Sequence, residues 1–225
     1  MPQVWPDDIV PNACEFFLQH NTTVFESPIT RTRQRLRRPG ERWMCTASFR
    51  LVREKAQRLD ALLAKLSGSY DTVRLGDWAR IRPSGDNLDK SGIPNTIFSD
   101  GTTFTDGTGF AVPNEIARVR YGEVRGSSTI RTEGWMPDTA PLDAGDYIEV
   151  GGWLYMLAED AFANGVGDSI LQVVPRVRET VASQTLLVRQ RPKSPMMLID
   201  DDQPNRSIQV GTVYHYTLSF AEALV

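Results

Sequence analysis

The sequence predicts a mainly β protein, a β-sandwich or barrel with one amphipathic helix over about 52–67 and a small inserted β domain. Three observations support this fold class. Many short apolar runs have the period of two that is typical of strands, and turn residues separate them. Only one segment has helical spacing, and the composition changes near Gly85 and again near Asp200. Many short strands with a single helix indicate sandwich or barrel architecture.

The first strands are expected between a proline-rich arm and the helix. Pro2, Pro6 and Pro11 favour an extended arm. Apolar residues predict a strand over Cys14–Gln19, a turn near residues 20–21, and a return that ends at Pro28. An arginine-rich strand follows, and residues 39–41 form a turn. In the next strand Trp43, Cys45, Ala47 and Phe49 or Leu51 share one face.

The helix is predicted from apolar residues at helical spacing, with charged residues on the opposite side. The apolar positions are Val52, Ala56, Leu59, Leu62, Leu63 and Leu66. Gly68 stands where a C-terminal cap is expected. We therefore expect this helix to bury its leucines against a sheet.

The remaining chain is predicted to be β-rich. A short strand includes Val73 and Leu75, and residues 86–134 are rich in turn residues with short β-patterned runs such as Ala117–Val124. Residues 147–157 form a hairpin around a Gly-Gly turn. The composition changes predict a discontinuous domain of residues 1–85 and 200–225, interrupted by an inserted β domain of residues 86–199.

Motifs of catalysis are largely missing from the sequence. The chain has only two histidines, His20 and His215, and neither lies in a recognisable catalytic motif. No zinc, calcium or phosphate-binding pattern has the required spacing, so we expect no enzyme activity, no metal and no cofactor. Cys14 and Cys45 are interpreted as buried free thiols.

Composition also limits the partners. The net charge of −3 argues against a general nucleic-acid binder, which usually has a strong basic excess. No apolar stretch approaches the roughly 18 residues that span a bilayer, and no secretory signal is visible. We expect a protein that is made in a cytoplasm and has no membrane partner.

A local basic run contrasts with this acidic chain. In "TRTRQRLRR" Arg31, Arg33, Arg35 and Arg37 alternate with other residues, and Arg38 follows. The period of two predicts a strand with the four alternating guanidinium groups on one face, where they repel one another unless water or an acidic partner lies opposite. Three interpretations remain open: a protein interface, solvated charges that protect an edge strand from aggregation, and contact with nucleic acid.

Four segments resemble a known family. They are "ERWMCTASFRLVREKAQRLDALLAKLSGSYDTVRLGD", "AGDYIEVGGWLYMLAEDA", "VVPRVRE" and "YHYTLSFAEAL". Together they resemble the distal tail proteins at the tail tip, or baseplate, of long-tailed bacteriophages and gene transfer agents. The resemblance covers Arg42–Asp77 and Leu142–Leu224. It implies an N-terminal β domain that carries a helix, is closed by the last strand and forms a ring, and a second, variable β domain.

The resemblance implies a structural virion protein whose ring, commonly sixfold, connects the tail tube to the hub or baseplate. We expect Arg31, Arg33, Arg35, Arg37 and Arg38 to lie at subunit contacts, and the arm Met1–Asn12 to lie over a neighbouring subunit. The alternative is a carbohydrate-binding module for host attachment. In that case Tyr121 and Trp135 are the candidate aromatic contacts for a glycan.

Overall fold

The computed structural model describes residues 2–85, 117–201, 207–209 and 213–224. For residues 207–209 it describes the backbone alone. The turn-rich stretch predicted to begin at residue 86 lies outside the described residues as far as residue 116. The chain divides into two compact units, of which unit 1 is Met1–Trp78 with Ser194–Val225 and unit 2 is Ala79–Lys193. The observed divisions thus follow residues 78 and 193, whereas the composition suggested residues 85 and 199. The mainly β fold class is confirmed.

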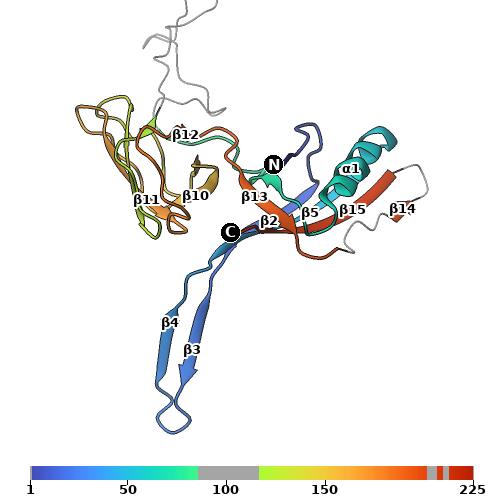
Figure 1. The fold of residues 1–225 in the computed structure, drawn as a ribbon, viewed down its shortest axis with the longest axis horizontal. Coiled ribbons are helices and arrows are strands. Elements are labelled where there is room, and N and C mark those ends of the chain that lie inside the picture. Colours follow the sequence, from blue (N-terminus) through green and yellow to red (C-terminus); the bar gives the residue numbers. More distant parts are fainter. Residues whose placement is uncertain (1, 86–116, 202–206, 210–212, 225) are drawn as a thin grey trace, which may run out of the picture. The chain divides into compact units, whose positions relative to one another are not determined.

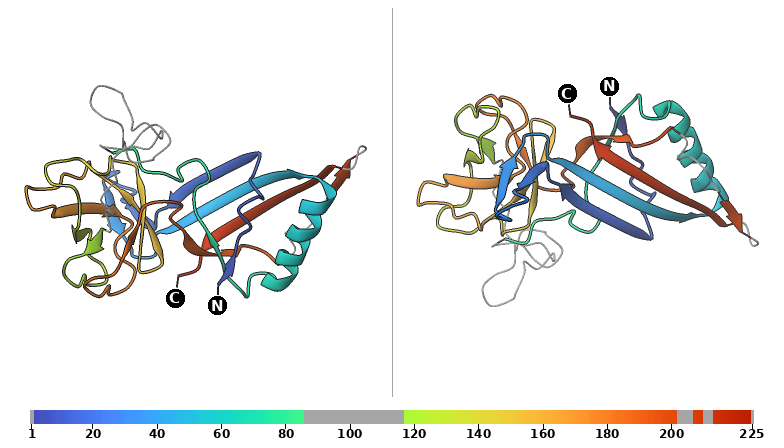
Figure 2. Two further views of the ribbon diagram at one scale, coloured as in Figure 1. Left: turned by 90° about the horizontal axis from the view of Figure 1, so that it is seen from above. Right: turned by 90° about the horizontal axis from the view of Figure 1, so that it is seen from below.

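Unit 1 is built on one seven-stranded sheet in the order β1-β6-β13-β15-β5-β2, with β14 paired to β15 (Figures 1 and 2). The strands are β1 (Gln3–Val4), β2 (Ala13–Gln19), β5 (Arg42–Leu51), β6 (Val73–Leu75), β13 (Ser194–Leu198), β14 (Ser207–Gln209) and β15 (Val213–Glu222). The final strand β15 lies between β13 and β5, so the C-terminal segment completes the sheet that the N-terminal segment begins. Strand β2 lies at the edge of the sheet and pairs only with β5.

The helix α1 (Arg53–Leu66) agrees with the predicted helix to within a residue at each end. Its buried residues are Ala56, Leu59, Leu62, Leu63 and Leu66, as the spacing predicted. The helix lies along the β5 and β15 part of the sheet (Figure 1), where the Tyr216 hydroxyl donates a hydrogen bond to Asp60 Oδ1 at 2.9 Å. Ser67 ends the helix in the left-handed conformation, which is a common C-terminal cap.

The inner face of the sheet holds the core of unit 1. On β5, Trp43, Cys45, Ala47, Phe49 and Leu51 are all buried, which confirms the predicted shared face. Their neighbours on the next strand, Tyr216, Leu218 and Phe220, are buried as well. One face of this sheet is therefore covered by apolar packing, as expected for an antiparallel sheet with one buried side.

The N-terminal arm packs against its own unit, and the expectation that it also lies over a neighbouring subunit stays a prediction. Trp5 and Ile9 are buried, and the Trp5 indole nitrogen donates a hydrogen bond to the Ile9 carbonyl at 2.7 Å. The Trp5 ring lies 5.4 Å from the Phe49 ring, between ring centroids. Burying a tryptophan removes a large apolar surface from water, so the arm gains more by covering its own core than by remaining extended.

Strands β3 (Thr22–Glu26) and β4 (Arg33–Arg37) form a separate two-stranded sheet. This sheet projects beyond the ends of β2 and β5 (Figure 1). Strand β2 pairs with β5 up to Gln19 opposite Arg42, and β3 pairs with β4 from Thr22 opposite Arg37. The two pairs are therefore consecutive parts of one long hairpin. The pairing is interrupted only at residues 20–21 on one side and 38–41 on the other.

Unit 2 is a small antiparallel barrel of six strands in the order β12-β9-β10-β11-β8-β7. The strands are β7 (Arg118–Val119), β8 (Thr129–Glu133), β9 (Tyr147–Val150), β10 (Trp153–Leu157), β11 (Ser169–Val174) and β12 (Leu187–Val188). A bridge between Arg118 and Leu186 brings the first strand to the last and nearly closes the sheet. Closure leaves few unpaired edges in a small β domain.

The predicted hairpin at the centre of unit 2 is confirmed. Strands β9 and β10 pair from Trp153 opposite Val150, and Gly151 and Gly152 form the turn with φ of +60° and +87°. Two consecutive positive φ values are what a two-residue hairpin turn of type I′ requires, and glycine adopts them without steric cost.

Candidate functional site

The β3–β4 hairpin, Thr22–Arg37, is the candidate functional site because it bears the arginine run. At its tip, Ser27 and Thr32 are linked by a backbone hydrogen bond of 2.9 Å, and Arg31 donates its N–H to the Ser27 carbonyl at the same distance. The segment Arg33–Arg37 is a strand, as predicted. Arg31 is not part of it, because it lies in the turn with φ of +55°. Arg38 follows the strand and donates its N–H to the Asn21 carbonyl at 2.8 Å.

The register of the hairpin sorts its side chains onto two faces. Arg33, Arg35 and Arg37 lie opposite Glu26, Val24 and Thr22, and together they form the arginine face. Gln34 and Leu36 lie opposite Phe25 and Thr23, and together they form the apolar face. All five residues of β4 are exposed to solvent. The strand therefore presents three aligned arginines instead of the four that the alternation predicted.

Two of these three arginines are neutralised inside the chain. The Arg33 Nε lies 2.8 Å from Glu26 Oε2 on the paired strand. The Arg37 Nη2 lies 2.6 Å from Glu41 Oε1. Arg35, between them, has no ion-pair partner among the described residues. Glu26 of the hairpin and Glu41 at its base thus supply part of the acidic partners that the repulsion between the arginines requires. On the arginine face, Arg35 is the guanidinium that remains available to another molecule, and Arg31 and Arg38 are exposed beside it.

The base of the hairpin is held by a buried carboxylate. Glu41 is only 5% exposed, although glutamate is rarely buried without a partner. It accepts hydrogen bonds from Arg37, and His20 Nδ1 lies 3.5 Å from its Oε1. Asn21 Nδ2 also donates a hydrogen bond to the Pro39 carbonyl at 2.8 Å. These contacts span both sides of the interruption and join the exposed hairpin to the sheet.

Several apolar side chains on the hairpin are in contact with water. Phe25 is 55% exposed and Leu36 is 53% exposed on the apolar face. Val24 on the arginine face and Ile29 at the tip are exposed as well. An isolated two-stranded hairpin is only marginally stable in water, and a cluster of exposed apolar side chains is typical of an interaction surface. The arginine run alone did not predict this apolar face, although the alternation in "TTVFE" and "RQRLR" contained the signal for it.

The hairpin and the rest of the chain carry opposite net charges. The hairpin together with Arg38, residues 22–38, holds five arginines and one glutamate, a net charge of +4. Because the whole chain has a net charge of −3, the other residues together carry −7. A basic segment of this kind favours an acidic partner, and such an attraction weakens as salt screens it.

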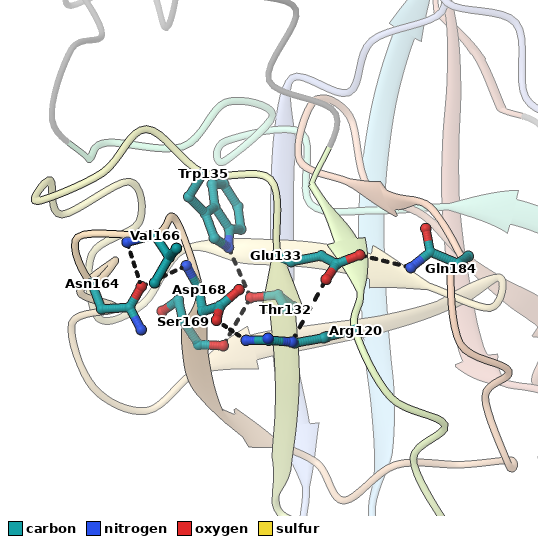
Figure 3. A network of polar contacts seen from close by, with 9 residues as sticks. All are labelled: Arg120, Thr132, Glu133, Trp135, Asn164, Val166, Asp168, Ser169 and Gln184. Atoms are coloured by element: carbon teal, nitrogen blue, oxygen red, sulfur yellow. Dashed lines mark hydrogen bonds and ion pairs between the residues drawn. The ribbon is translucent and has the colours of Figure 1, made fainter.

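Unit 2 contains the two aromatic residues proposed for glycan contact, and the structure separates their roles. Trp135 is only 4% exposed and belongs to the apolar core, and its Nε1 donates a hydrogen bond to Thr132 Oγ1 at 2.8 Å (Figure 3). Its ring has no face available to a sugar, so its assignment as a contact residue is wrong. Tyr121 is 53% exposed, and the Arg120 guanidinium lies 5.3 Å from its ring centroid. The pair of aromatics expected for a glycan platform is therefore reduced to Tyr121.

The polar groups near Tyr121 already bind one another. Arg120 forms ion pairs with Asp168 and with Glu133, the latter at 3.7 Å between Nε and Oε2 (Figure 3). Gln184 Nε2 donates a hydrogen bond to Glu133 Oε1 at 2.6 Å. This network joins β7 and β8 to the loops that precede β11 and β12. Its contacts hold these elements together.

In the part of the chain that the structure describes, no three His, Cys, Asp or Glu side chains gather as metal ligands would. Within the same residues, no helix combines the length and apolar character needed to cross a bilayer. No family model matches the sequence, and no curated protein is similar enough to count as a relative.

Proposed function

We propose that this chain is a structural protein of a phage tail tip, in which copies form a ring that connects the tail tube to the hub or baseplate. The proposal assigns it no enzymatic activity. The resemblance over Arg42–Asp77 and Leu142–Leu224 supports the family. The observation that carries the assembly role is the β3–β4 hairpin, which extends from the sheet with both of its faces uncovered among the described residues.

In the proposed ring, the hairpin of each copy contacts the next copy at residues outside its hairpin. Such a contact joins two different surfaces, so it is heterologous, and repeated heterologous contacts close into a ring when the rotation between copies permits. The apolar face, with Phe25 and Leu36, supplies the burial of apolar surface. The +4 charge of the hairpin against −7 on the rest of the chain supplies attraction and orientation.

Assembly is tested by sedimentation velocity of the purified full-length chain over a range of protein concentrations. We expect one discrete species larger than the 25.2 kDa chain, whose dissociation increases with salt. A 25.2 kDa species at every concentration and at low salt would contradict self-assembly.

The location is tested separately by electron microscopy. Virions released by cells that carry this gene are labelled with an antibody to the chain. We expect label at the distal end of the tail. Label on capsids, or unlabelled tails beside a positive control antibody, would refute the virion role whatever the oligomeric state in solution.

A further inference from the structure

Two cysteines that are far apart in the sequence meet on the inner face of unit 1. Cys14 lies on β2 opposite Ala47, and Cys45 lies on β5 opposite Phe16, so they are diagonal neighbours across the strand pair. Their Sγ atoms are 3.8 Å apart and share a hydrogen bond. The sulfurs of a disulfide are about 2.05 Å apart. Closing the remaining gap requires small side-chain rotations and a slight shift of the edge strand β2.

The two thiols differ in exposure and in acidity. Cys14 is half-buried, whereas Cys45 is buried. The hydrogen bond from the Cys45 thiol lowers the pKa of Cys14. The same hydrogen bond, together with burial, raises the pKa of Cys45. A partly exposed thiol whose pKa is lowered by a thiol neighbour that stays protonated is the arrangement of an attacking cysteine with a resolving cysteine.

We propose that Cys14 and Cys45 are a redox pair that forms a reversible intrachain disulfide by exchange with a small-molecule disulfide such as oxidised glutathione. The proposal is independent of the tail-tip function, because it depends only on the packing of β2 on β5 within one chain.

The exchange occurs in two steps, through a mixed disulfide. The Cys14 thiolate attacks one sulfur of oxidised glutathione, a mixed disulfide forms, and one glutathione thiolate leaves. The Cys45 thiol then gives up its proton and its sulfur attacks the Cys14 sulfur, which releases the second glutathione as a thiolate. Overall the two protein thiols are oxidised, and one molecule of oxidised glutathione is reduced to two thiols.

The bond would fasten the edge strand to the sheet and enclose the hairpin. The loop between Cys14 and Cys45 contains β3 and β4 entirely, so the disulfide would close the base of the long hairpin. Diagonal neighbours on paired strands have Cα atoms about 7–8 Å apart, which exceeds the roughly 4.4–6.8 Å that a disulfide usually spans, so the edge strand β2 must move toward β5 and the bond is strained. Strained disulfides are readily reduced, so we expect a bond that dithiothreitol opens easily.

The test uses the folded, reduced full-length protein incubated with oxidised glutathione. Excess reagent is removed, the protein is unfolded in guanidinium, and its thiols are counted with Ellman's reagent and its intact mass is measured. We expect the two thiols to disappear, the mass to fall by two hydrogen atoms with no glutathione retained, and dithiothreitol to restore both thiols. Two remaining thiols, or a stable glutathione adduct of the native sequence, would overturn the proposal.

Single variants distinguish the two roles. Cys45→Ser removes the resolving thiol, so Cys14 should accumulate one glutathione. Cys14→Ser leaves only the buried thiol, which should remain unmodified over the same period. Cys45→Ala replaces Cys45→Ser if circular dichroism shows that the serine disturbs the fold. Equal reaction of the Cys14→Ser variant and the native protein would refute the assigned order of attack.

Discussion

The apolar face of the hairpin offers the sharpest test of the assembly proposal. Phe25→Thr with Leu36→Thr removes both exposed apolar side chains, and threonine keeps a high preference for strands. Because the native side chains are 55% and 53% exposed, an interface can bury about half of each. Full burial of such a side chain stabilises by about 1.5–3 kcal/mol, so the two halves together contribute roughly 1.5–3 kcal/mol per interface.

A loss of that size weakens association roughly 10- to 140-fold, since about 1.4 kcal/mol corresponds to a factor of ten. Sedimentation velocity over a concentration series measures the change, and circular dichroism with thermal melting should show an unaltered fold. Ile170→Thr on β11 is the matched control, because Ile170 is 61% exposed on a strand of unit 2. Association of the double variant at the native strength, or equal weakening by Ile170→Thr, would refute the reasoning.

Three further variants test the charge, the core and a pH-dependent contact. Arg35→Glu should weaken association about five-fold at low salt and less at high salt, whereas Arg131→Glu, an exposed arginine of unit 2, should not; sedimentation at two salt concentrations checks this. Leu59→Ala should lower the free energy of unfolding by about 2–5 kcal/mol in denaturant titrations, because Leu59 lies on the buried side of α1 and is fully buried. A loss below about 1 kcal/mol would contradict that packing. Asp201 accepts hydrogen bonds from the Ser69 N–H and hydroxyl, which lower the pKa of its carboxyl from 3.8. The stabilisation that the Asp201 carboxylate provides is therefore present above about pH 4 and is lost as the pH falls below that value. The melting temperature of Asp201→Asn should accordingly differ most from that of the native protein near neutral pH. A difference in melting temperature that stays constant down to pH 2 would contradict this.

The local elements could be read from the sequence because their causes are local. The helical spacing of the leucines predicted α1. The Gly151-Gly152 pair predicted the β9–β10 hairpin, because a two-residue hairpin turn needs residues that adopt positive φ. The alternation of arginines predicted strand β4, because a period of two is local to a strand, but the prediction was wrong at Arg31. There the turn required a left-handed backbone that the charge pattern does not encode.

The contacts that define the candidate site depended on the tertiary structure. Strand register decided that Arg33 meets Glu26, that Phe25 and Leu36 share a face, and that the two cysteines meet from β2 and β5. The closing of the barrel decided that Trp135 is core and not a contact residue.

By itself, the sequence determined which segments are strands, which one is a helix and where charge concentrates, since these properties follow from a few adjacent residues. Only the tertiary structure decided which side chains face one another and which remain in water. The physical reason is that shifting a strand by one residue exchanges its two faces, and the packing of distant segments selects among those registers.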